Sequence, residues 1–299
     1  MNEYESNMLK AGVLAKQVRA FGKSLIVVGA SYNSIILQIK SKILELGAVA
    51  AFPPQIAIND VAAHYLPAPN QDVIFDETMV VSLDIGVCVD GAIGDCAVSV
   101  DLTADNKYKT LIEASQKALE AAQSILKVGL PIGEIGRVIE ETIQSYGFEP
   151  VRNLSGHGVG KYEIHTKPGI PNYDTGSKKT LEPGMTFAIE PFATSGSGMI
   201  HEVGEAHIFS FSTKRAVRSP TAKILLKKIA TFQNLPFDTH DLVDAKTPYA
   251  KVKFGLRELI QSGIIAAHPP LVEVDNGIVT QAENTVMIDS DGIVHITTQ

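Results

Sequence analysis

The sequence predicts an α+β fold with pseudo-twofold organisation, in which antiparallel strands lie at the centre and helices lie outside. Two observations predict it. Residues 78–102 have the pattern of a β-hairpin, with two arms rich in Val, Ile and Leu around an Asp90-Gly91 turn. In addition, a pair of helical patterns occurs twice at an offset of 100 residues, and acid-bearing strands follow each pair. The length of 299 residues suffices for one large domain or two ordinary ones.

The hairpin carries one acid in each arm, Asp84 and Asp95, among apolar neighbours. Burial of a lone carboxylate is costly, so each acid should be paired, hydrogen-bonded or bound to a metal. If the arms pair about the turn, the two acids lie on adjacent strands and could face one another, where they repel unless a cation lies between them. Carboxylates satisfied by backbone N–H groups, or ordinary exposed acids, are the alternative at this point.

The first half begins with two helical patterns. Apolar spacing predicts a helix over residues 3–19, and Ser31 or Asn33 can cap a second helix that ends at Gly47. Pro53-Pro54 then excludes a regular central strand directly after it.

The second half repeats this pattern. Thr103 or Asp105 is expected to cap a helix through about residue 126, and a further helix ends at Gly147. The residues that match at the offset of 100 are Val28, Gly29, Ile35, Ile39, Ile43 and Gly47 with Val128, Gly129, Ile135, Ile139, Ile143 and Gly147.

Downstream strands extend the repeat to four acids. A strand that ends in Glu190 corresponds to the strand that carries Asp84, and a late strand with Glu283 corresponds to the arm with Asp95. Two similar halves would thus bring four carboxylates together at the centre.

Composition excludes several classes of protein. The net charge of −7 argues against nucleic acid or an anionic membrane as the main partner. The acidic, polar N-terminus is not a signal peptide, and the least charged stretch is too short and interrupted to span a bilayer. The two cysteines, Cys88 and Cys96, fit a reducing compartment and are expected to be small core residues, with metal binding as the minor alternative. We therefore expect a cytoplasmic protein.

Four buried acids need cationic compensation, and bridging carboxylates suit a pair of divalent ions. Three histidines are candidates to join them: His157 in a glycine-rich turn, His165 eight residues later, and His64 in the first half. A lone histidine is more often a hydrogen-bonded structural residue than a ligand. The four acids at symmetric positions favour the metal interpretation here.

At this point the chain resembles a known family. Five residues match, in order and approximate spacing, the dimetal ligands of the methionine aminopeptidases: Asp84, Asp95, His157, Glu190 and Glu283. The local motifs are LDIGVCVDGAIGDCA, SGHGVGKYEIH, FAIEPF and QAENTVM, and the resemblance covers essentially the whole chain. These enzymes belong to the pita-bread metallopeptidases, and the resemblance implies a single catalytic domain over residues 1–299.

The resemblance implies hydrolysis of the N-terminal methionine from peptides and nascent proteins, with a small second residue preferred. It implies two divalent ions as cofactors, with Co, Mn, Fe or Zn as candidates. Glu190 is expected to accept a proton as well as bind metal, and His64 and His165 to bind substrate and stabilise the tetrahedral intermediate. Phe52 and Ile164 are expected to line the methionine pocket, with plain core packing as the alternative. We expect a monomer.

The chain looks most like the type 2 subfamily in a short, archaeal-like form. Residues 211–271 contain two extra helical patterns, over 221–231 and 250–262, which resemble the helical subdomain inserted in type 2 enzymes. Three departures are expected to change the pocket wall: His268, where Tyr is usual, and Ala282 and Asn284 beside Glu283, where Phe and His are common. The stretch MIHEVGEAHIF gives no clean match for a pocket histidine of some members, although His207 is near that position.

Two alternatives remain open. A proline-specific aminopeptidase or prolidase uses the same fold and ligands, but usually carries a further N-terminal domain, for which a helix that begins at about residue 3 leaves no room. A non-catalytic binding protein on this scaffold typically lacks metal ligands, whereas all five are present here.

Overall fold

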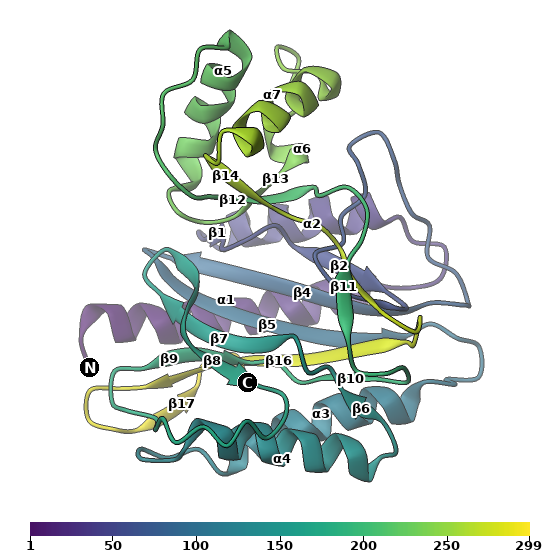
Figure 1. The fold of residues 1–299 in the computed structure, drawn as a ribbon, viewed down its shortest axis with the longest axis vertical. Coiled ribbons are helices and arrows are strands. Elements are labelled where there is room, and N and C mark those ends of the chain that lie inside the picture. Colours follow the sequence, from purple (N-terminus) through teal and green to yellow (C-terminus); the bar gives the residue numbers. More distant parts are fainter.

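The computed structural model describes residues 1–299, with helices outside antiparallel sheets (Figure 1). The helices are α1 (Glu3–Leu25), α2 (Tyr32–Glu45), α3 (Lys109–Ser124), α4 (Ile132–Ser145), α5 (Pro220–Ile229), the 3₁₀ turn η1 (Ala230–Phe232), α6 (Thr239–Leu242) and α7 (Tyr249–Gln261). The strands are β1 (Val49–Ala50), β2 (Gln55–Ile58), β3 (Val61–Ala63), β4 (Val80–Val89), β5 (Ala92–Asp101), β6 (Glu149–Pro150), β7 (Ser155–Gly160), β8 (Glu163–Pro171), β9 (Thr186–Ile189), β10 (Phe192–Thr194), β11 (Ile200–Glu202), β12 (Ile208–Phe211), β13 (Phe237–Asp238), β14 (Ile265–His268), β15 (Leu271–Glu273), β16 (Val279–Ile288) and β17 (Val294–Ile296).

The central sheet has 11 strands and contains the path β1-β4-β5-β16-β9-β7-β8. The predicted hairpin is confirmed as β4 and β5, which pair continuously around the Asp90-Gly91 turn. Strand β16, near the end of the chain, lies between β5 and β9 and is antiparallel to both. The two halves of the chain therefore meet at the β5–β16 pair.

The internal repeat is also confirmed. Helix α2 covers residues 32–45 and α4 covers 132–145, and the short strands β1 and β6 follow at 49–50 and 149–150. Gly29 and Gly129 have φ values of +87° and +83°, and Gly47 and Gly147 have +73° and +81°. Glycine is favoured at these positions because other L-residues are strained at positive φ. The same backbone turns therefore bound both helices.

Each helix pair covers one half of the central sheet. One hydrophobic core joins α1, α2 and β4, and a second joins α3, α4, β9 and β16. Along β4, Leu83 and Ile85 face the first core, so the intervening Asp84 points to the opposite face of the sheet. Helix α1 extends to Leu25, beyond the predicted end. None of the helices has the length and apolar character needed to cross a bilayer.

The cysteines lie on opposite faces of the hairpin, as strand alternation predicts. Cys96 belongs to the helix-side core, and Cys88 lies in a separate cluster that includes Phe52. Both thiols are free and buried. The prediction that they are small core residues is therefore confirmed.

The predicted start of α3 is wrong. The helix begins at Lys109, and neither Thr103 nor Asp105 caps it. Instead, Asp101 accepts hydrogen bonds from the backbone N–H groups of Thr103 and Tyr108, which closes a turn ahead of the helix. Side chains that cap a helix and side chains that stabilise a turn are of the same types, so the sequence does not separate them.

Residues 208–268, called the α5–α7 segment below, lie above the central sheet in Figure 1. Strands β13, β12 and β14 form a small sheet in that order, and the helices pack on it around a core that includes Leu225, Phe237 and Leu256. The two helical patterns predicted here are confirmed as α5 with η1, and α7. Lys40 of α2 binds Asp238 and Asp241 with N–O distances of 2.6 and 2.8 Å, which ties this segment to the first half.

Candidate metal centre

A cavity of about 810 Å³ is lined by the acid-bearing face of the central sheet and by residues of the α5–α7 segment. Its wall includes all nine residues that the sequence predicts as metal ligands, catalytic groups or substrate contacts. These are Phe52, His64, Asp84, Asp95, His157, Ile164, His165, Glu190 and Glu283. Residues from both halves of the chain thus face one space.

The four acids come from four adjacent strands. Asp84 is on β4, Asp95 on β5, Glu283 on β16, and Glu190 directly follows β9. The hairpin acids do not lie directly opposite one another, because Asp95 pairs with Gly86 and Asp84 pairs with Ala97. Ala97 also pairs with Glu283, so the acids share one face of the sheet in staggered rows.

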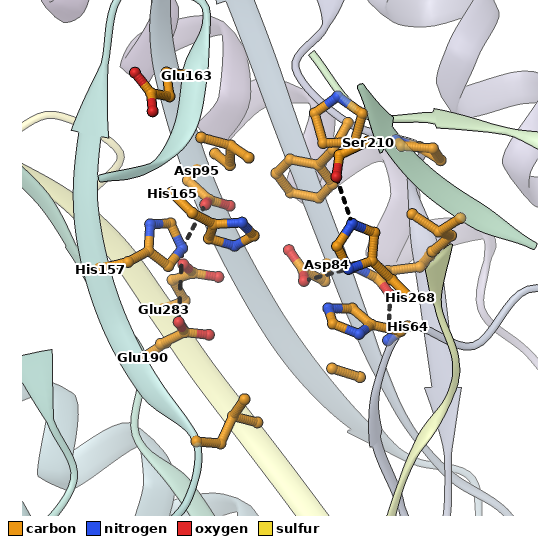
Figure 2. A pocket seen from close by; sticks show the side chains of 18 of the residues that line it. His64, Asp84, Asp95, His157, Glu163, His165, Glu190, Ser210, His268 and Glu283 are labelled. Carbon is orange, nitrogen blue, oxygen red and sulfur yellow. Dashed lines mark hydrogen bonds and ion pairs between the residues drawn. The ribbon is translucent and has the colours of Figure 1, made fainter. Parts of the chain in front are cut away.

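His157 brings an imidazole to this group of acids (Figure 2). Its Nε2 atom lies 3.6 Å from Oδ2 of Asp95 and 3.7 Å from Oε1 of Glu190. Its Nδ1 atom lies 3.1 Å from the carbonyl oxygen of Gly158, which favours a proton on Nδ1 and leaves Nε2 free to coordinate. Ligand atoms of Asp95, His157 and Glu283 all lie within 4.8 Å of one another. This geometry suits a shared cation.

The acids lack the partners that burial requires. Oδ1 of Asp84, Oδ1 of Asp95 and Oε1 of Glu283 are buried and accept no hydrogen bond. Burial raises the pKa of Asp84 to about 7, and burial together with mutual repulsion raises the pKa values of Asp95, Glu190 and Glu283 well above the usual range. Divalent cations among these oxygens would give the unpartnered oxygens a partner and would offset the repulsion between the acids. The residues present therefore fit a metal centre.

Two glutamines that we did not assign from the sequence support the acids. Nε2 of Gln281 lies 3.3 Å from Glu283 and 3.4 Å from Glu190, and Nε2 of Gln55 lies 3.2 Å from Asp84. Gln55 also accepts the backbone N–H of His64 through Oε1 at 2.6 Å. Gln281 lies two positions before Glu283 on β16, so strand alternation was the available signal for it.

Three further histidines line the cavity: His64, His165 and His268 (Figure 2). The ring centroids of His64 and His268 are 5.6 Å apart, and His165 lies 4.3 Å from the ring of His157. A hydrogen bond of 2.8 Å joins Oγ of Ser210 to Nε2 of His268 and fixes the orientation of that ring. Desolvation within the cavity and the neighbouring imidazoles lower the pKa values of His64 and His165 to about 4, so both are neutral at pH 7.

The predictions about the pocket wall need two corrections, at Ala282 and Asn284. His268 does line the cavity, but Ala282 and Asn284 do not, because they alternate with Glu283 and point to the other face of β16. Ala282 joins the second core, and Asn284 accepts a hydrogen bond from Arg19. His207 lies outside the cavity, beside Thr239.

His157 lies in strand β7, and the predicted glycine-rich turn is therefore also wrong. The glycines serve close strand packing instead. A Cβ atom at Gly156 would lie 2.4 Å from the carbonyl oxygen of Ala188, and one at Gly158 would lie 2.5 Å from that of Lys167.

Gly156→Ala is therefore expected to displace β7 from β9 and to move His157. We expect a loss of about 1–3 kcal/mol in the free energy of unfolding and weaker metal binding. Thermal unfolding and metal titration measure the two effects. As a control, Gly169→Ala adds a Cβ with no atom closer than 3.8 Å and should leave both values near wild type.

Comparison with known proteins agrees with this geometry. The model of metallopeptidase family M24 matches residues 6–218. The methionine aminopeptidase of Archaeoglobus fulgidus is 40% identical over 299 residues, which cover 100% of this chain and 99% of that protein. The chain belongs to metallopeptidase family M24.

Two solved structures show the same fold. A thermophilic Arx1 superimposes with a TM-score of 0.85 at 16% identity, covering 98% of this chain and 90% of that one. The methionine aminopeptidase of Thermotoga maritima superimposes with a TM-score of 0.72 at 24% identity, covering 100% and 98%. The pita-bread fold expected from the sequence is thus confirmed.

Proposed function

We propose that this chain removes the N-terminal methionine from peptides and nascent proteins, and that it prefers a small second residue. One observation carries the proposal: a chain that is 40% identical to an archaeal methionine aminopeptidase over its full length keeps five ligand-type side chains around one cavity. Three of their oxygens are buried without a partner, as expected for a site that binds cations.

Two divalent ions would be held by Asp84, Asp95, His157, Glu190 and Glu283. This oxygen-rich set with one imidazole accepts Co, Mn, Fe or Zn. When bound, such ions lower the pKa of a shared water and polarise the scissile carbonyl.

The chain's own residues would supply the remaining steps. Glu190 lies at the edge of the acid group, 3.7 Å from His157, and is our candidate to take the proton of the attacking water and return it to the leaving amine. Neutral His64 and His165, which line the same cavity, can donate hydrogen bonds to the substrate carbonyl as negative charge develops on it.

The methionine side chain would occupy the apolar end of the cavity. Phe52 and Ile164 are both buried and belong to one hydrophobic cluster with Val159 and Leu235. The Phe52 ring packs where a side chain at position 86 would be, so Gly86 is needed to admit it beside Asp84. We infer that these apolar groups select an unbranched hydrophobic side chain.

We also propose that residues 1–299 form a single catalytic domain and that residues 211–271 are the inserted helical subdomain of a type 2 enzyme. In support, this stretch contributes Ser212, Asn234, Pro236 and His268 to the cavity wall while its helices pack on a core of their own.

We further propose that the chain works as a monomer, since both halves of the acid group come from one chain.

The function is tested by release of free methionine. Metal-stripped protein is assayed on Met-Ala-Ser, Met-Leu-Ser and Ala-Pro peptides, with and without added Mn or Co. We expect metal-dependent cleavage of Met-Ala-Ser only. Cleavage of Ala-Pro alone would favour a proline-specific enzyme, and no cleavage by metal-loaded protein would favour a binding protein.

His165→Ala is expected to lower kcat by about 10²-fold while both metal ions stay bound, because His165 faces the substrate space. Turnover measurements and metal analysis check the two parts. His201→Ala, at an exposed position outside the cavity, is the matched control and should behave as wild type. Loss of metal from His165→Ala would show that this residue is a ligand.

A further inference from the structure

A second groove, of about 570 Å³, continues from the active-site cavity and shares Asn153 and Ser155 with it. Asn153 is fixed at this junction because its side chain makes two hydrogen bonds with the backbone of Ile200. The remaining wall comes from the segment between β6 and β7, from the start of α4, from β8 and from the loop between β8 and β9. These residues are Ile132, Arg152, Lys167, Pro168, Gly169, Pro171, Tyr173, Thr175, Ser177 and Lys179.

The two spaces carry opposite charge. The active-site cavity is lined by five acids and by no lysine or arginine. The second groove is lined by Arg152, Lys167 and Lys179 and by no acid. The charge of Arg152 is offset by Glu140 at 2.8 Å, whereas no carboxylate lies within 4.0 Å of Lys167 or Lys179. These two exposed ammonium groups are therefore free to bind an anion.

The groove lies within reach of a substrate that occupies the active site. Gly169, in its wall, pairs directly with His157, so their Cα atoms are about 5 Å apart. Ser155, at the junction, lies two residues from His157 on the same strand, or about 7 Å. One extended residue spans about 3.4 Å, so the third to fifth residues of a substrate would reach the groove.

The direction of the substrate follows from the methionine pocket. Ile164 lies near the tip of the β7–β8 hairpin, whereas Ser155 and Pro171 pair at its base. If the methionine side chain lies at the tip with Ile164 and Phe52, the rest of the peptide leaves toward the base. This step rests on the proposed function.

We propose that this groove, called the basic groove below, is a subsite for the part of the substrate beyond the second residue and that it favours acidic side chains there. Lys167 and Lys179 are the specificity-determining residues. Because both are exposed, each ion pair contributes little, and the effect should weaken as salt rises.

The test uses amidated peptides Met-Ala-Xaa-Xaa-Gly in which Xaa is Asp, Asn or Lys. We expect kcat/KM to be about three- to tenfold higher for the Asp peptide than for the Lys peptide at low salt, from two exposed ion pairs. The ratio should approach one in the Lys167→Gln/Lys179→Gln variant. A Lys127→Gln/Lys223→Gln variant removes two exposed, unpaired lysines elsewhere and should keep the preference.

A binding measurement separates this inference from the proposed function. Fluorescently labelled Ser-Asp-Asp-Gly amide should bind metal-loaded protein more tightly than Ser-Lys-Lys-Gly amide, and the Lys167→Gln/Lys179→Gln variant should lose the difference. The same peptides as free acids show whether a terminal carboxylate can replace the side chains.

The subsite would be overturned if the two labelled peptides bind equally and the three Met-Ala peptides have equal kcat/KM. Methionine removal would then remain intact. A preference for Asp that survives the double variant would also overturn the subsite. Selective binding of the acidic peptide without cleavage of any Met-Ala peptide would support the subsite and refute the proposed function.

Discussion

Glu283→Gln is expected to lower kcat/KM on Met-Ala-Ser by about 10²- to 10³-fold, because the proposed metal pair would lose one of its charged ligands. Glu283 is 1% exposed, and its Oε1 atom has no protein partner. The shape of the side chain is kept, so packing changes little. Metal content after dialysis should fall toward one ion per chain.

The same variant is expected to stabilise the metal-free protein. Four acids are buried together there, and removal of one charge reduces both the desolvation cost and the repulsion on the other three. We expect the melting temperature of the metal-free variant to rise by roughly 2–5 °C. If Glu283→Gln lowers the melting temperature of both the metal-free and the metal-loaded protein, Glu283 serves packing and not metal binding.

Asp289→Asn is the matched control, since Asp289 is a buried acid directly after β16. It accepts hydrogen bonds from the backbone N–H groups of Asp291 and Ile293, and it pairs with His295 at 2.7 Å. Its substitution should lower stability with and without metal and leave turnover unchanged. Wild-type turnover and full metal loading in Glu283→Gln would contradict the assignment of the site.

Metal-free protein is expected to lose stability as the pH rises above about 6.5. In the folded state the pKa of Asp84 is raised to about 7, and those of Asp95, Glu190 and Glu283 are raised further above their usual values. A raised carboxyl pKa means that the folded state binds protons more tightly than the unfolded state. Its stability therefore decreases as pH rises from the unfolded value through the folded one.

The histidines confine this effect to a pH window. Desolvation lowers the pKa of His157 to about 3 and those of His64 and His165 to about 4, so their contribution to stability increases with pH up to about 6.5. Below pH 6.5 the acids and the histidines oppose one another. Above it only the acids still titrate, and the loss becomes visible.

Thermal unfolding between pH 6 and 9, with chelator or with excess Mn, measures this effect. The melting temperature of chelated protein should fall across that range, and added metal should restore it most strongly at the highest pH. A flat profile for the chelated protein would mean that the acid group is already compensated by protein groups, and the metal assignment would fail.

Much of the fold could be predicted from local sequence. The repeat was visible because Gly29, Gly47, Gly129 and Gly147 mark positive-φ positions that few other residues tolerate. The hairpin was visible because alternating β-branched residues flank an Asp-Gly turn. The resemblance to a known family then indicated all nine candidate site residues, and the structure brings all nine to one cavity.

Side-chain direction was harder to predict. Ala282 and Asn284 were expected on the pocket wall, yet they point away from it, because only alternate residues of β16 share a face with Glu283. The support given by Gln55 and Gln281 was also missed. Strand alternation places Gln281 on the same face as Glu283, but it does not show that the amide binds the acids.

By itself, the sequence determined the repeated helices and the hairpin, and it supplied the acids and histidines that we propose as the site. These features depend on residues close together in the chain, where backbone strain and periodicity act directly. Only the tertiary structure decided that β16 lies between β5 and β9, that His268 faces His64, and that Lys167 and Lys179 share a groove with Ser155. Those arrangements arise from packing between segments that are distant in the chain. Local sequence patterns do not indicate which distant segments become neighbours.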